Sequence, residues 1–191
     1  MRIRMVTESD VIFGSGMADA GLVDTEVQVD EEGFPYYKGG TFKGVFREAL
    51  ELYLSWTGGA KSTAERILGK PGSDDVGGKL VFSDFEISRA VKDIVYQEMN
   101  DNHVLDGPEA VTEAMTNIRT FTRISEEGAA AKGSLRKARC VNKGLSFYAD
   151  IEVPEGEEEL VREVLFSIRW IGTMRNRGFG RVRFEEVKGG A

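Results

Sequence analysis

The 191-residue sequence is poor in cysteine and histidine: Cys140 and His103 are the only residues of their kinds. One cysteine excludes an intrachain disulfide, and one cysteine with one histidine cannot complete a structural zinc site. No apolar run approaches the roughly 18 residues that a membrane span needs. The N-terminal MRIRMVTESD also lacks the apolar core of a signal peptide. We therefore expect a cytoplasmic protein in which His103, within the polar stretch NDNHVLDG, is a surface residue rather than a catalytic one.

Basic residues are outnumbered by acidic ones, 25 to 32, which gives a formal net charge of −7. The charges are unevenly distributed, however. Residues 119–143 contain seven basic and two acidic residues, and residues 169–188 contain six basic and two acidic residues, whereas residues 17–34 contain six acidic residues and no basic one. Exposed charges more than roughly 10 Å apart are screened at ordinary salt, so a partner experiences the local charge. The net charge therefore does not decide whether the protein binds nucleic acid.

The hydrophobic pattern predicts one α+β domain over residues 1–191. Strands are expected at RIRMVT, KLVFSDFEIS, GLSFYADIEV and RVRFEEV, and long helices are expected from Thr41 and within PEGEEELVREVLFSIRWIG. A shorter helix is expected after Pro108, and no element is predicted for residues 88–107. The order βαββαβ is that of a ferredoxin-like (RRM-type) fold, with a large insertion before the third core strand.

The stretch TMRNRGFGRVRF places Arg175, Arg177, Arg181 and Arg183 among the glycines at positions 172, 178 and 180. Glycine lets backbone amides approach a ligand closely, and arginine binds phosphate in a two-pronged geometry. Glycine alone could end a helix whose carboxyl end attracts basic residues. The interleaving of four arginines with glycine favours a phosphate-binding loop.

Three further segments are candidates for binding or chemistry. In GGTFKGVFR, Lys43 and Arg47 share one helix face near a helix start that attracts anions, although a solvated face explains them equally well. The acidic residues Asp19, Asp24, Glu26, Asp30, Glu31 and Glu32 could hold Mg²⁺ through waters or act on a ribose hydroxyl, or could simply be a solvated loop. FTRISEEGAAAKGSLRKARCV is predicted to be a basic hairpin. It could reach across nucleic acid or a neighbouring subunit, or its basic residues could simply protect exposed edge strands.

Taken together, these segments resemble the RAMP superfamily of CRISPR-associated proteins. The resemblance rests on FGSGMADAG, DTEVQVDEEGFPYYKGGTFKGVFREAL, TRISEEGAAAKGSLR, GLSFYADIEV and IGTMRNRGFGRVRF, which follow one another in the family's order. The sequence is most similar to the backbone (Cas-seven-type) subunit of type III effector complexes. That resemblance implies a ferredoxin-like palm with a β-hairpin thumb at about 120–141 and a glycine-rich loop at 172–180. Its implied partners are guide RNA (crRNA), target RNA, further copies of the chain in a filament and other CRISPR effector subunits.

The resemblance also implies which residues act. Asp24 precedes a second acid and a Gly-x-Pro-aromatic turn as the family's catalytic aspartate does, with Asp19 and Asp30 as the next candidates. Cleavage of target RNA by such a subunit uses a divalent metal (Mg²⁺ or Mn²⁺), which Asp24 would hold with waters, and leaves 2′,3′-cyclic phosphate and 5′-hydroxyl ends. The residues expected to bind RNA are Lys43, Arg47, Arg136, Lys137, Arg175, Arg177 and Arg181. The alternatives are a scaffold subunit that does not cut and, ranked lower, a guide-RNA processing endoribonuclease.

Overall fold

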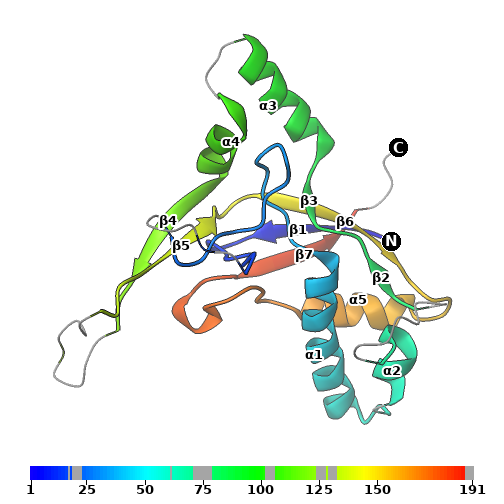
Figure 1. Cartoon of the computed structure of the whole chain (residues 1–191). Coiled ribbons are helices and arrows are strands. Elements are labelled where there is room, and N and C mark those ends of the chain that lie inside the picture. Colours follow the sequence, from blue (N-terminus) through cyan, green and yellow to red (C-terminus); the bar gives the residue numbers. More distant parts are fainter. Residues whose placement is uncertain are drawn as a thin grey trace.

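The computed structural model describes residues 1–16, 18, 23–60, 62–70, 79–101, 106–123, 128, 133–187. Two antiparallel sheets and five α-helices make up this part of the chain (Figure 1). The main sheet contains β1 (Arg2–Thr7), β2 (Val81–Phe82), β3 (Glu86–Ile87), β6 (Ser146–Glu152) and β7 (Val182–Glu186). The second sheet pairs β4 (Thr116–Phe121) with β5 (Arg136–Val141). The α-helices are α1 (Gly39–Thr57), α2 (Ser62–Leu68), α3 (Arg89–Asp101), α4 (Gly107–Met115) and α5 (Glu158–Ser167), and a single 3-10 turn, η1, covers Arg175–Arg177.

The central strand of the main sheet is β1. It pairs with β6 on one side, in a register that places Arg4 opposite Tyr148, and with β7 on the other, where Met5 lies opposite Phe184. The outer edge of β6 pairs with β2 and β3 in turn. All of these pairs are antiparallel and are combined with helices, as expected for the α+β class that the sequence pattern predicted.

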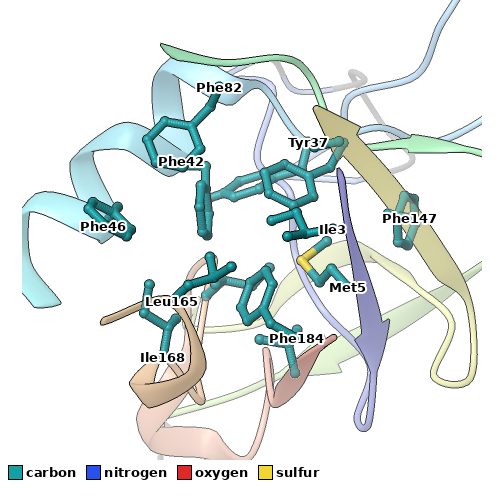
Figure 2. Close-up of a cluster of buried hydrophobic side chains, with 14 of the residues drawn as sticks. Ile3, Met5, Tyr37, Phe42, Phe46, Phe82, Phe147, Leu165, Ile168 and Phe184 are labelled. Carbon is teal, nitrogen blue, oxygen red and sulfur yellow. The ribbon is translucent and has the colours of Figure 1, made fainter. Parts of the chain in front are cut away.

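The core lies between one face of the main sheet and helices α1 and α5. Side chains of a strand alternate between its two faces, so Ile3, Met5 and Thr7 of β1 are buried on the same side. Phe42 of α1 is fully buried there, with its ring centroid 4.7 Å from that of Phe85 and 5.4 Å from that of Phe184. Figure 2 shows the aromatic and aliphatic side chains that fill this layer. Aromatic burial of this kind contributes most of the driving force for folding.

Helix α1 begins two residues before the predicted start at Thr41. The backbone N–H of Gly39 donates a 2.8 Å hydrogen bond to Asp84, and a Cβ at Gly39 would lie 2.3 Å from the carbonyl oxygen of Phe82. The connection between β2 and β3 therefore supplies the cap for this helix end, and only glycine lets it approach. Since Asp84 is 45 residues away in sequence, local pattern could not have located this start.

Two other segments differ from the sequence prediction. Residues 89–101, for which the sequence pattern predicts no element, form α3, whose Tyr96 packs edge-on against Phe34 while Ile94 stays exposed. The predicted strand KLVFSDFEIS is interrupted between β2 and β3, because Ser83 and Asp84 there bond to Asp150 and to Gly39. Within the described part of the chain, no helix combines the length and apolar character needed to cross a membrane.

Candidate nucleic-acid interface

The glycine-rich segment forms a loop between α5 and β7 that is held at both ends by backbone hydrogen bonds. The N–H of Ile171 donates to the carbonyl of Gly180, and the N–H of Gly180 donates to the carbonyl of Asp10. Gly172, Gly178 and Gly180 all have positive φ, as the phosphate-loop prediction requires. Between these pinned ends, η1 presents the exposed side chains of Arg175 and Arg177.

The loop packs on the paired strands β4 and β5, hereafter the β4–β5 ribbon, which projects from the body (Figure 1). Phe179 of the loop contacts Phe121 of β4 edge-to-face, with ring centroids 5.4 Å apart. The guanidinium of Arg177 lies 5.9 Å from the centroid of the Phe121 ring. These contacts bring together two basic segments that are separated by more than 30 residues in sequence.

Asp10 joins the glycine-rich loop to strand β4 of the ribbon. Its side chain accepts hydrogen bonds from Arg119 (2.7 Å), from Asn117 (3.2 Å) and from the backbone N–H of Lys143 (3.1 Å). Burial disfavours the charged form of this carboxyl, but these hydrogen bonds outweigh burial and lower the pKa of Asp10. The sequence offered no sign of this role, because all three partners lie more than 100 positions away.

Cys140 provides a check on the docking of the ribbon. Its side chain is fully buried, and burial, aided by the nearby charge of Asp10, raises the pKa of the thiol to about 12. Because the thiolate is the reactive form, we expect Cys140 of the folded protein to resist a thiol reagent at pH 8 and to react rapidly in denaturant. Rapid labelling under native conditions would mean that the ribbon separates from the loop.

Asp24 lies at the outer edge of the β4–β5 ribbon. Residues 23–27 run parallel to β5, and the backbone N–H of Asp24 donates to the carbonyl of Lys137. One carboxylate oxygen of Asp24 accepts a 2.8 Å hydrogen bond from the backbone N–H of Lys137. The side chain is otherwise exposed, so its carboxylate is fixed in position at Lys137 yet open to solvent.

An ion pair between Arg139 and Glu26 restrains the same segment two residues after Asp24. Nε of Arg139 lies 2.9 Å from Oε1 of Glu26, although its N–H is not aligned for a hydrogen bond with any described group. Arg139 also donates to the hydroxyl of Thr116. Asp24 and Glu26 are two residues apart in extended backbone, so they share a side of the segment. The pair with Arg139 thus restrains the backbone that carries Asp24.

The other two candidate acids differ from Asp24. Both carboxylate oxygens of Asp30 are engaged: Oδ1 accepts from the N–H groups of Glu32 and Phe34, and Oδ2 lies 2.6 Å from Nζ of Lys92. These contacts describe a turn-stabilising residue. Asp19 and His103 lie outside the described residues. No group of three or more histidine, cysteine, aspartate or glutamate side chains suited to a metal occurs among the residues that the structure describes.

The predicted basic residues are not all brought to one place. Arg47 of α1 donates a 2.8 Å hydrogen bond to the carbonyl of Gly69 at the end of α2, while Lys43 is half-buried one turn earlier. Arg175 approaches α1 at Glu48, with a 4.0 Å separation between charged atoms. Arg181 is paired with Glu8 at 2.9 Å. The structure therefore places Lys137 next to Asp24, Arg136 on the opposite face of the ribbon across from Phe121, and Arg175 and Arg177 on the loop.

Tyr37, in the segment just before α1, joins that segment to the loop. Burial raises the pKa of its hydroxyl to about 12, against the smaller opposing effects of the Gly172 backbone and the Arg175 charge. Its ring stacks on that of Phe13 at 4.7 Å. The aromatic pair in PYYKGG thus contributes a buried contact between the start of α1 and the glycine-rich loop, which the sequence motif alone did not reveal.

The match to a protein-family model shows which class of protein this is. The chain belongs to the RAMP superfamily, whose family model matches residues 4–183. Among solved structures, the chain is similar to a chain of the cryo-EM structure of the Type III-B Cmr-beta bound to cognate target RNA. That match has 13% identity and a TM-score of 0.69, and covers 96% of this chain and 95% of the other. A chain of the Type III-B Cmr-beta in the apo state matches with 13% identity and a TM-score of 0.70, covering 98% and 96%. No curated protein matches the sequence.

Proposed function

We propose that the chain is a guide-RNA-binding backbone subunit of a type III CRISPR effector complex. The observation that carries the proposal is the convergence of the glycine-rich loop with the basic β4–β5 ribbon at Phe121, Arg177 and Phe179. Membership of the RAMP superfamily supports it, as does the likeness over nearly the whole chain to a chain of the Type III-B Cmr-beta bound to target RNA. The surface where loop and ribbon meet would hold the guide backbone, while pairing between guide and target supplies sequence specificity.

In this proposal the main sheet with α1 and α5 is a ferredoxin-like palm and the ribbon is the thumb. The strand order, with β1 between β6 and β7 and with β2 and β3 outside β6, supports that assignment. So does the placement of α1 and α5 against the same face of the sheet. Copies of the subunit would stack along guide RNA, with each thumb displacing one nucleotide, and would meet target RNA and other effector subunits.

We further propose that Asp24 cuts target RNA at the displaced nucleotide. Its exposed carboxylate would take the proton of the ribose 2′-hydroxyl, whose oxygen then bonds to the adjacent phosphorus as the bond to the 5′-oxygen breaks and that oxygen gains a proton. The products are a 2′,3′-cyclic phosphate and a 5′-hydroxyl. Among the described residues Asp24 is one available carboxylate rather than part of a cage, which fits Mg²⁺ or Mn²⁺ shared with waters and phosphate oxygens. Such an ion would neutralise charge on the phosphate.

Three other functions make different predictions. A scaffold subunit without catalysis has the same RNA contacts but needs no reactive Asp24. A guide-RNA processing endoribonuclease would cut a precursor alone and without metal. A ferredoxin-like module that binds a small anion or another protein would neither bind RNA in a length-dependent way nor stack with copies of itself.

The proposal predicts RNA binding that weakens with salt and strengthens stepwise with RNA length. Neutralising Arg175 and Arg177 together as Arg175→Gln/Arg177→Gln should lower the slope of log K against log salt by about 0.7 for each phosphate that the variant no longer neutralises. The physical reason is that each neutralised phosphate releases a condensed counterion. Fluorescence anisotropy of labelled single-stranded RNA across a salt series measures the slope.

Arg162→Gln is the matched control. Arg162 lies on α5 and pairs with Glu186 at 2.9 Å, away from the loop and ribbon. Its neutralisation should leave the slope unchanged. A double variant with the wild-type slope would contradict the loop as a phosphate site. The same assay on Lys43→Gln and on Arg47→Gln measures the contribution of each residue to the salt slope. We expect a smaller change in slope for Arg47→Gln, because the guanidinium of Arg47 already bonds to Gly69.

A further inference from the structure

A small apolar cluster, separate from the main core, lies where the glycine-rich loop meets the β4–β5 ribbon. Its buried centre consists of Ile12, Ala138 and Cys140. Phe121 and Phe179 pack at its rim and remain partly exposed. A cluster that served only to dock the ribbon would gain most by burying its largest rings, because burial scales with apolar area. Here Ile12, Ala138 and Cys140 are buried, whereas the two rings remain partly exposed.

Two arginines lie at this rim. Arg177 lies over the Phe121 ring, and Arg136 is directly opposite Phe121 in the strand register. Neither forms an ion pair with a described carboxylate, and Arg136 donates to the carbonyls of Gly133 and Leu135. Nearby arginines are paired instead, such as Arg119 with Asp10 and Arg139 with Glu26. Positive charge is therefore left available at the aromatic rim.

We propose that Phe121, Phe179 and Arg177 form a stacking site for an unpaired base of single-stranded RNA. This inference rests on the proposed function and adds a base-binding surface to it. Nucleobases stack on aromatic rings and on guanidinium planes, and such stacking tolerates any base. The unpaired charges of Arg177 and Arg136 would meet the phosphates that flank the stacked base. The site therefore holds a nucleotide without reading its identity.

The test uses the full chain and a single-stranded RNA carrying the fluorescent base 2-aminopurine, moved position by position. Stacking quenches 2-aminopurine, so wild-type protein should quench it. Phe179→Leu keeps apolar volume in the cluster but removes the ring. It should weaken RNA binding about tenfold and abolish quenching, because base–aromatic stacking is lost. Phe179→Tyr keeps the ring and should restore both. Phe166→Leu, at a half-buried phenylalanine on α5, is the matched control and should change neither.

The outcomes separate this site from the proposed function. RNA binding and quenching that survive Phe179→Leu would overturn the stacking site while leaving the RNA-binding function intact. Failure of the wild-type chain to bind RNA even at low salt would overturn the proposed function itself. Unfolding midpoints measured for each variant distinguish loss of a ring from loss of the fold. If Phe179→Leu does not fold, Arg177→Gln is the deciding variant, because Arg177 is exposed and its loss leaves the apolar cluster intact. Reduced quenching by this variant would support the stacking site, and quenching at the wild-type level would overturn it.

Discussion

Replacing Asp24 with asparagine is expected to reduce target RNA cleavage by the assembled complex at least about 100-fold, the usual contribution of a positioned general base. Binding of guide and target should not change. An asparagine oxygen can still accept the hydrogen bond that Lys137 donates at 2.8 Å, so residues 23–27 remain paired with β5. What the variant lacks is the negative charge that takes a proton or attracts a cation. Cleavage of labelled target RNA under single-turnover conditions measures the effect.

Asp30→Asn is the matched control for this experiment. Asp30 belongs to the same acidic loop, but its oxygens bond to backbone N–H groups and to Lys92. We expect this variant to lose some stability and to keep cleavage. Asp24→Ala should behave as Asp24→Asn does, and EDTA should stop the wild-type reaction until Mg²⁺ or Mn²⁺ is restored. Full cleavage by both Asp24 variants would remove Asp24 from the mechanism and favour the scaffold role.

Replacing Gly180 with alanine is expected to destabilise the protein by about 3 kcal/mol or more, a loss at the upper end of single substitutions. Gly180 has φ +82°, and a Cβ there would lie 2.0 Å from the carbonyl oxygen of Ile171. That carbonyl belongs to backbone that pairs with Gly180 through the N–H of Ile171. Neither group can move without disturbing the hydrogen bonds that join Gly180 to Ile171 and to Asp10. Urea unfolding measures the free-energy change, and RNA affinity should fall with it because Arg175 and Arg177 lose their support.

Gly178→Ala is the control within the same loop. Gly178 has φ +84°, nearly that of Gly180, but nothing lies within 4 Å of the position of a Cβ. This variant should cost about 1–2 kcal/mol, the strain of a left-handed backbone alone. The difference between the two variants isolates the close backbone approach at Gly180. Equal losses would mean that the loop uses glycine only for its conformation.

Several elements could be read from local sequence because local physics forms them. Ile3 and Met5 alternate with Arg2 and Arg4, so β1 was evident from its two-residue period. The helical spacing of buried residues in α1 and α5 was equally clear. Helix α3 was missed although Val91, Val95 and Met99 recur at helical spacing. The β4–β5 pairing was anticipated, although β4 begins at Thr116 and therefore extends closer to the body than the predicted arm.

The candidate site was anticipated in parts. The glycine-rich loop and its arginines were singled out from composition, and the family resemblance pointed to Asp24. The partners of these residues were not foreseen. Asp10, Phe121 and the pair of Glu26 with Arg139 had no local signature, because each acts through residues far away in the chain. Arg47, in contrast, was expected from helical spacing to bind RNA together with Lys43. Its guanidinium bonds instead to the end of α2.

The sequence by itself determined the strands and the two long helices, the glycine positions that permit a left-handed loop, and the clustering of basic and acidic charge. Those properties depend on periodicity, backbone sterics and composition, which act over a few residues. Only the tertiary structure decided which clusters meet. Asp24 lies on the ribbon's outer edge because parallel pairing joins its segment to β5, 113 positions further along the chain. The glycine-rich loop lies on the ribbon because Phe179 packs against Phe121. Contacts over such distances depend on the whole core, and no local pattern encodes them.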